Sequence, residues 1–302
     1  MNAIEINQLS KSFGERKILD AISFAVPKGS VVGFVGENGA GKTTTMKLIL
    51  GLLKSDSGQI TVCNEPVVYG NAQTNRKIGY LPDVPQFYSF MTAAEYLHFC
   101  GKISGLGKQL SSQIDEILQL VNLEKSNKKI SSYSRGMKQR LGLAQALLSK
   151  PEILICDEPT SALDPLGRKA FLDLLLAIKQ ETTVLFSSHI LSDVEQISDY
   201  VAILHQGKIK LFGEMEELKT KFRQEDYHLQ FATPEDTARF CQLADAAAID
   251  WKRENHQLTI PENPSSQQGQ KVLQLLVENE LVPQLFQKND SSLEKIYLEV
   301  VK

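Results

Sequence analysis

The chain has 302 residues, of which 42% are apolar and 23% charged, and its formal net charge is −3. This composition is ordinary for a globular protein, and the length allows one large domain and a smaller one. It has no apolar run near the roughly 20 residues of a membrane-spanning helix and no secretory signal at its start, so we expect a cytoplasmic protein.

The cysteine content bears on the cellular compartment and on structural metals, and the charge distribution bears on nucleic-acid binding. The four cysteines are far apart and form no C-x-x-C pair, which indicates a reducing compartment and no structural metal. Residues 1–214 carry 23 Lys and Arg against 21 Asp and Glu, whereas residues 215–302 carry 10 against 15. The acidic end disfavours binding to a phosphate backbone, so we predict no nucleic-acid partner.

The first third of the chain has mainly strand patterns. Residues 4–7 and 22–26 alternate between apolar and polar side chains, and residues 31–35 are continuously apolar, as in a strand buried on both faces. A glycine-rich segment and a helix from about Lys42 to Leu50 follow. Strand patterns return at 59–81.

The middle of the chain alternates helices and short strands. Residues 92–148 have helical spacing, and the apolar strands at 153–156 and 183–186 flank a helix at about 166–179. This order predicts a parallel sheet. The run Ser192-Asp193-Val194-Glu195 has the spacing of a capping box and predicts the start of another helix.

Charge and pattern both change near residues 215–224, where we place a domain boundary. Beyond it, strand patterns at 227–231, 248–253, 257–261 and 284–287 and helical patterns at 234–243 and 267–278 give the order β-α-β-β-α-β. This order is typical of a ferredoxin-like domain. We therefore predict an α/β domain over 1–214 and a small α+β domain over 215–302.

A phosphate-binding loop is the first chemical motif. Residues 36–43 match G-x-x-x-x-G-K-[ST] between a strand and a helix, so backbone N–H groups can surround phosphate oxygens. Lys42 is predicted to reach the β- and γ-phosphates, and the hydroxyl of Thr43 to ligate Mg²⁺. The predicted nucleotide-binding positions are Gly36, Asn38, Gly39, Ala40, Gly41, Lys42, Thr43 and Thr44.

Two carboxylates follow the apolar strand at 153–156, where α/β sheets place ligands. Asp157 is predicted to hold Mg²⁺ through water. Glu158 is predicted to orient and deprotonate the attacking water.

A second anion site lies in Ser134-Arg135-Gly136, because a hydroxyl and a glycine N–H open a helix there. One protomer with one phosphate loop has no obvious use for it. The economical explanation is a γ-phosphate bound by a neighbouring copy.

Together with the runs 157–164 and Ser187-Ser188-His189, these motifs resemble an ATP-binding cassette (ABC) ATPase over about residues 2–214. The resemblance implies a P-loop NTPase cassette with a helical subdomain at about 84–148. It also implies that Phe13 stacks on adenine, that Asp164 lies in a loop bridging two protomers, and that His189 contacts the γ-phosphate. With Lys42 and Glu158, His189 completes the predicted catalytic set.

Two positions depart from the family pattern. The family's signature motif, Leu-Ser-Gly-Gly-Gln, reads Tyr133-Ser134-Arg135-Gly136-Met137 here, which keeps the Ser and the Gly that touch phosphate in the family. Asp83 stands where the family has a glutamine. A carboxylate can ligate Mg²⁺, so Asp83 joins Thr43 and Asp157 as a predicted metal ligand.

The resemblance implies an ATP-hydrolysing subunit of an ABC transporter that uses ATP and Mg²⁺. It would pair with a second ABC subunit, as a homodimer, and power a separate transmembrane permease from the inner face of the cell membrane. The C-terminal unit resembles the tails of drug, antibiotic and lantibiotic-immunity exporters, which favours export. The cluster Phe87-Tyr88-Ser89-Phe90 either receives a permease helix or packs internally.

Two alternatives compete with the transporter. A soluble ABC ATPase acting on ribosomes or DNA usually has two cassettes or a long coiled coil between the motifs. This chain has one cassette, with only about 90 residues between phosphate loop and signature. A kinase or GTPase would leave Ser134-Arg135-Gly136 unexplained.

Overall fold

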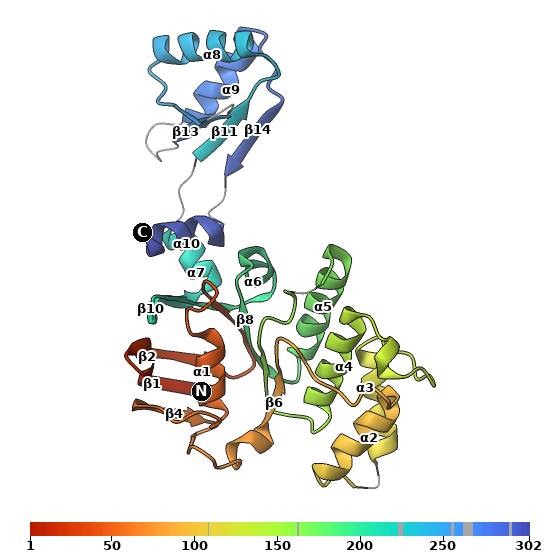
Figure 1. The fold of residues 1–302 in the computed structure, drawn as a ribbon. Coiled ribbons are helices and arrows are strands. Elements are labelled where there is room, and N and C mark those ends of the chain that lie inside the picture. The colour runs from red at the N-terminus through yellow and green to blue at the C-terminus, as the bar shows by residue number, and fades with distance from the viewer. Residues whose placement is uncertain (108, 162, 223–225, 255–256, 262–267, 290–291) are drawn as a thin grey trace. The chain divides into compact units, whose positions relative to one another are not determined.

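The computed structural model describes residues 1–302 except 108, 162, 223–225, 255–256, 262–267 and 290–291. The chain divides into two compact units, Met1–Met215 with Val300–Lys302, and Glu216–Glu299 (Figure 1). The division falls one residue after the boundary expected from the sequence, and the last three residues group with the larger unit. Within the described part of the chain, no helix combines the length and apolar character needed to span a membrane.

A six-stranded sheet forms the centre of the larger unit, in the order β10-β9-β3-β8-β7-β6. β3, β7 and β8 are buried along their whole lengths, as their apolar runs predict. All neighbours are parallel except β9 and β10, which confirms the predicted α/β class. The strands are β3 (Val31–Val35), β6 (Ile78–Leu81), β7 (Ile153–Cys156), β8 (Thr183–Ser188), β9 (Tyr200–His205) and β10 (Lys208–Glu214).

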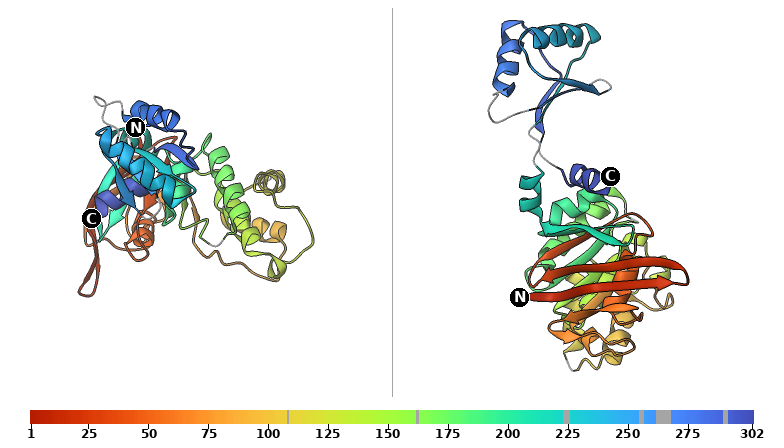
Figure 2. Two further views of the ribbon diagram at one scale, coloured as in Figure 1. Left: turned by 90° about the horizontal axis from the view of Figure 1, so that it is seen from above. Right: turned by 90° about the vertical axis from the view of Figure 1, so that its left-hand side faces the viewer.

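A second, antiparallel sheet has the order β2-β1-β4-β5 (Figure 2, right). Met46 and Ile49 of helix α1 (Lys42–Ile49) share one hydrophobic core with both sheets. The turn between β1 and β2 brings Phe13 opposite Arg16. The strands are β1 (Asn2–Phe13), β2 (Arg16–Pro27), β4 (Ser57–Val62) and β5 (Glu65–Pro66).

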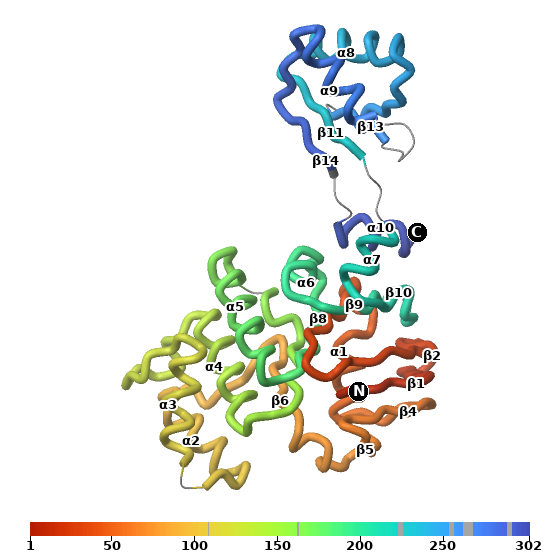
Figure 3. The backbone as a smooth tube through the Cα atoms, turned by 180° about the vertical axis from the view of Figure 1, so that it is seen from behind, coloured from red at the N-terminus to blue at the C-terminus, as the bar shows by residue number. Residues whose placement is uncertain are grey.

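Three helices within residues 84–148 form a group beside β6, against which α4 packs (Figure 3). Thr92 and Glu95 form a capping box at the start of α2. The buried residues of α3 recur at helical spacing, as predicted. The helices of this region are α2 (Ala93–Ile103), α3 (Leu110–Leu120) and α4 (Arg135–Leu147), with the short 3₁₀ helices η1 (Thr74–Lys77) before it and η2 (Ile130–Ser132) within it.

The helices α5 (Pro165–Ile178) and α6 (Leu191–Ile197) follow β7 and β8. The predicted capping box at Ser192 is wrong, because α6 begins at Leu191 and its N-cap, Ile190, makes no side-chain hydrogen bond. Asp193 turns inward instead and accepts a hydrogen bond from Thr160 Oγ1 at 2.7 Å. A capping box at Ser192 would have placed the N-cap two residues later, and its second residue, Asp193, is instead buried against Thr160.

The smaller unit contains the predicted β-α-β-β-α-β order, with the sheet order β12-β13-β11-β14. Leu229, Phe240, Leu258, Ile260 and Val272 belong to its core. The strand expected at 248–253 is shorter, because α8 ends with Ile249 N–H bonded to the carbonyl of Ala244. The elements are β11 (Asp226–Gln230), α8 (Pro234–Ala246), β12 (Lys252–Glu254), β13 (Gln257–Pro261), α9 (Gln268–Glu278) and β14 (Leu285–Asn289), and the remaining helices are α7 (Met215–Lys221) and α10 (Leu293–Val301).

Candidate active site

The predicted site residues follow the carboxyl ends of four adjacent parallel strands. The phosphate loop follows β3, His189 follows β8, Asp157 and Glu158 follow β7, and Asp83 follows β6. The strands are paired in sequence across the sheet, so these ends lie along one edge. Ligands of α/β proteins bind at this edge.

The phosphate loop has two glycines that its backbone requires. A Cβ on Gly36 would lie 2.5 Å from the carbonyl oxygen of Leu204, and Gly41 has a φ of 115°. Gly41 is the N-cap of α1 and makes no side-chain capping hydrogen bond, so the first N–H groups of the helix remain available to a ligand. This end of a helix favours anions.

Lys42 curls back over the loop, and its side chain is only 5% exposed. Its Nζ donates to the carbonyl oxygens of Gly36 at 2.6 Å and Glu37 at 3.2 Å. It also lies 3.0 Å from Oε1 of Glu158. That oxygen accepts no aligned hydrogen bond within the described residues, so the two groups pair by charge.

The two carboxylates after β7 are held differently. Asp157 is 2% exposed, and its Oδ1 accepts a hydrogen bond from Ser187 Oγ at 2.7 Å. The same Ser187 oxygen accepts a hydrogen bond from the backbone N–H of Glu158 at 2.9 Å. Glu158 has a φ of 48°, in the left-handed region, which costs about 1–2 kcal/mol for a residue other than glycine. The loop after β7 therefore has a strained backbone, and two hydrogen bonds with Ser187 of β8 hold it in place.

Glu158 also contacts His189, the residue expected to contact the γ-phosphate. Its Oε2 lies 2.8 Å from Nδ1 of His189. The three predicted catalytic residues, Lys42, Glu158 and His189, thus form a continuous chain of contacts. No role was predicted for Ser187, although it lies in the run that contains His189.

A cavity of about 360 Å³ lies in front of these residues. Nine predicted site residues line it, including the predicted metal ligands Thr43 and Asp83. Arg16 and Ile18 also line it and were missed, although Arg16 flanks the same short turn as Phe13. The predicted residues in the lining are Phe13, Asn38, Gly39, Gly41, Lys42, Thr43, Thr44, Asp83 and Glu158.

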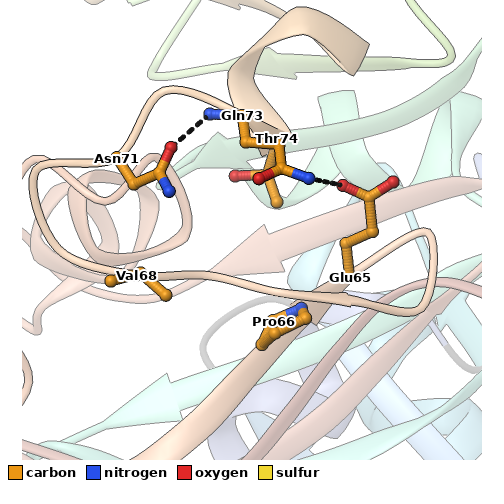
Figure 4. Close-up of a pocket in the computed structure, with 6 residues that line it drawn as sticks. All are labelled: Glu65, Pro66, Val68, Asn71, Gln73 and Thr74. Atoms are coloured by element: carbon orange, nitrogen blue, oxygen red, sulfur yellow. Dashed lines mark hydrogen bonds between the residues drawn. The ribbon is translucent and has the colours of Figure 1, made fainter.

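A smaller hollow, about 160 Å³, lies near η1 and contains none of the predicted residues (Figure 4). Its side-chain hydrogen bonds join Gln73 to Asn71 and to Glu65 across its rim. Its lining includes the start of the short 3₁₀ helix η1, which has the N-cap Gln73, but none of the motif residues. The cavity lined by the phosphate loop, Asp83 and Glu158 is therefore the candidate active site.

Asp83 is anchored at two points. Its Oδ1 accepts a hydrogen bond from Ser161 Oγ at 3.0 Å, and its backbone oxygen accepts one from Gln139 Nε2 at 3.1 Å. The cavity therefore has a carboxylate at the position where the family has a glutamine.

Ser134, Gly136 and Asp164 do not line the cavity. Ser134 is the N-cap of α4 and accepts a hydrogen bond from Met137 N–H at 3.2 Å. Asp164 caps α5 in the same way, through Gly167 N–H at 3.3 Å. Ala162, in the predicted bridging loop, lies outside the described residues. Within one chain, the signature residues therefore lie outside the cavity that the phosphate loop lines.

Comparison with known proteins agrees with the ABC ATPase resemblance of the motifs. The family model described as ABC transporter matches residues 19–161. The "Uncharacterized ABC transporter ATP-binding protein YxlF" of Bacillus subtilis is 41% identical over 301 residues, which cover 99% of both chains. The chain belongs to the ATP-binding proteins of ABC transporters. It is accordingly an ATPase subunit that binds and hydrolyses ATP to power transport.

Other relatives agree with this ABC ATPase assignment. "Bacitracin transport ATP-binding protein BcrA" of Bacillus licheniformis is 37% identical and covers 99% of this chain and 97% of its own. A solved ATP-binding subunit of an ABC transporter is 31% identical, with a TM-score of 0.66, and covers 73% of this chain and 93% of its own. The family and ATPase activity implied by the motifs are confirmed, and the kinase and GTPase alternatives are excluded.

Proposed function

We propose that this ABC ATPase drives an exporter as a head-to-tail homodimer. Each ATP would lie between the phosphate loop of one copy and the signature residues of the other. The supporting observation is the divided site, in which Lys42 and Glu158 line the cavity while Ser134 and Gly136 lie outside it.

Gly136 supports an outside contact. A Cβ there would meet only the Leu163 side chain at 3.6 Å and Ser134 Oγ at 4.0 Å, which are ordinary distances. Among the described residues, no close approach requires a glycine at this position. A group from another molecule, approaching the helix N-terminus, would require one.

The contacts support a separate role for each of the three predicted catalytic residues. Lys42 binds the β- and γ-phosphates, Glu158 takes a proton from the attacking water, and His189 orients Glu158 while contacting the γ-phosphate. The side chain of Phe13, 51% exposed at the cavity, stacks on adenine.

Mg²⁺ fits the oxygen donors of the site. Thr43 and Asp83 line the cavity and offer a hydroxyl and a carboxylate, the ligands that this ion prefers. Asp157, buried beside Ser187, would act through water. The ion would neutralise phosphate charge.

The permease would dock on exposed apolar side chains next to α2. Tyr88 is 50% and Phe90 67% exposed, and Ile103 at the end of α2 is 71% exposed. Phe87 packs edge-on against Tyr96, with ring centroids 5.2 Å apart. Phe87 thus packs internally, and so in part does Tyr88, whose ring lies edge-on at 5.5 Å from that of Phe99. The more exposed Phe90 and Ile103 fit an amphipathic permease helix.

Export of an antibiotic-like compound is supported by the similarity to the bacitracin protein, which extends through the smaller unit. The subunit would then work at the inner face of the cell membrane. Ribosome or DNA binding has no comparable support.

The decisive experiment uses Glu158→Gln in the full chain with ATP and Mg²⁺. We expect nucleotide to bind without turnover, so a dimer accumulates and is seen by gel filtration. The homodimer proposal fails if the ATP-bound variant stays monomeric. The export proposal fails if the cognate permease drives uptake that depends on an external binding protein.

A further inference from the structure

Gln139 is a buried polar side chain in the signature helix α4. It is 1% exposed, and burial of an amide is costly unless its hydrogen atoms have acceptors. Its Nε2 donates to the backbone oxygen of Asp83 at 3.1 Å and to that of Pro159 at 3.3 Å. Both N–H groups of the amide are therefore used.

The two acceptors belong to the two loops that carry acids into the cavity. β6 and β7 are paired up to Leu81 and Cys156, and Asp157 N–H still bonds to the oxygen of Leu81 at 2.8 Å. Beyond this point the loops are linked by the amide of Gln139 and by the hydrogen bond from Ser161 Oγ to Asp83 Oδ1, and only Gln139 also belongs to α4. Its amide holds the backbone of cavity-lining Asp83 and that of the residue after the strained Glu158.

Gln139 is fixed to the signature residues by the helix itself. It lies five residues after Ser134, about 7.5 Å along the axis of α4. A helix moves as one body, and hydrogen bonds of 3.1 and 3.3 Å tolerate only small displacements. A shift of α4 therefore changes the spacing of Asp83 and Glu158.

We infer that Gln139 couples the two nucleotide sites of the dimer. Ser134 and Gly136 contact the ATP bound by the partner, and this contact sets the position of α4. Through its two hydrogen bonds, Gln139 then adjusts the loops that carry Glu158 and Asp83 in its own site. Gln139 is a positioning residue, and this role rests on the proposed head-to-tail dimer. Its consequence is cooperative hydrolysis with little effect on nucleotide binding by one chain.

The test compares Gln139→Leu and Gln139→Glu, which both remove the two N–H donors, with Gln145→Leu. Gln145 lies on the same helix but accepts its hydrogen bond from Tyr96, at 2.9 Å. The measurements are fluorescent TNP-ATP binding to the monomer and the dependence of hydrolysis on ATP concentration. We expect both Gln139 variants to bind TNP-ATP within about 2-fold of the unaltered chain, but with a Hill coefficient reduced to 1 and kcat at least about 10-fold lower. Gln145→Leu should keep the cooperativity.

Three results would overturn the inference. The first is a folded Gln139 variant with unchanged cooperativity. The second is a loss of folding in both Gln139 variants but not in Gln145→Leu, which would make the amide purely structural. The third is non-cooperative hydrolysis by the unaltered chain together with a monomeric ATP-bound Glu158→Gln, which would refute the dimer itself.

Discussion

The Nζ of Lys42 lies 3.0 Å from Oε1 of Glu158, and the two side chains are 5% and 12% exposed. The cation of the phosphate loop and the carboxylate after β7 thus neutralise each other inside the cavity. Nucleotide phosphates compete for the same ammonium group, because they are anions bound at the same loop. In the proposed mechanism Lys42 then turns to the phosphates, and Glu158 keeps its contact with His189 and is free to act on water.

Substitutions of Lys42 and of Glu158 are therefore expected to have opposite effects on nucleotide affinity. Glu158→Gln removes a competitor for Lys42, so TNP-ATP affinity should be unchanged or higher while hydrolysis falls at least about 100-fold. Lys42→Ala should weaken binding about 10- to 100-fold, through loss of charge-assisted hydrogen bonds. Lys47→Ala, an exposed position on the same helix, is the control. Normal hydrolysis by Glu158→Gln would show that Glu158 is not the base.

Gly136→Ala separates folding from dimerisation. The protomer has room for the added methyl group, and alanine is a better helix former than glycine, so the melting temperature should stay equal or rise. ATP-driven dimerisation of the Glu158→Gln background should be lost, because the methyl group would collide with the partner's nucleotide. Gel filtration and thermal melting measure the two effects. Dimerisation at unchanged ATP concentration would contradict the in-trans role.

The sequence was sufficient where a function uses consecutive residues. The phosphate loop and Asp157-Glu158 are such cases, because strand, loop and helix signals adjoin them. Ser187 and Gln139 were missed as functional residues because their partners are 30 and 56 positions away and are met only in the folded chain. Ser192 failed for a related reason, since burial of the neighbouring Asp193 against Thr160 outweighed local capping.

Asp56 clamps the strand that carries Phe13. Its carboxylate accepts hydrogen bonds from Lys11 Nζ at 3.0 Å and Ser12 N–H at 2.6 Å, and the Lys11 ammonium lies 5.4 Å from the Phe13 ring centroid. These bonds, that from Lys11 first, lower the pKa of Asp56. We expect Asp56→Asn to weaken TNP-ATP binding about 2- to 5-fold, as loss of a cation–π contact would.

The pH dependence of this clamp follows from the direction of the shift. The lowered pKa of Asp56 means that its stabilising effect is complete above the unfolded value, about 3.9, and is lost as pH falls through the folded value. The difference in urea midpoint between the unaltered chain and Asp56→Asn should therefore vanish at low pH. Asp20→Asn, whose carboxylate pairs with Lys17 and Lys208, should not affect TNP-ATP binding. Equal nucleotide affinity in all three proteins would contradict the clamp.

Neighbouring aromatic residues should respond differently to substitution. Phe90→Ser changes an exposed side chain, so the free energy of unfolding should stay within about 0.5 kcal/mol, but co-purification with the permease should be lost. Phe87→Ala removes the edge-on contact with Tyr96 and should destabilise the chain by 1 kcal/mol or more. Retention of the permease by a folded Phe90→Ser variant would place the docking surface elsewhere.

The strands β3, β8, β7 and β6 are paired without interruption. The four loops that carry the predicted site residues therefore start from one rigid sheet. Buried central strands are among the last elements of a protein to open, so the strand ends that carry these loops keep their relative positions. In the proposed dimer, closure around ATP would therefore move the surrounding helices and the second copy relative to this sheet. Conservative substitutions inside β7 would consequently change the rate of ATP hydrolysis rather than the affinity for nucleotide.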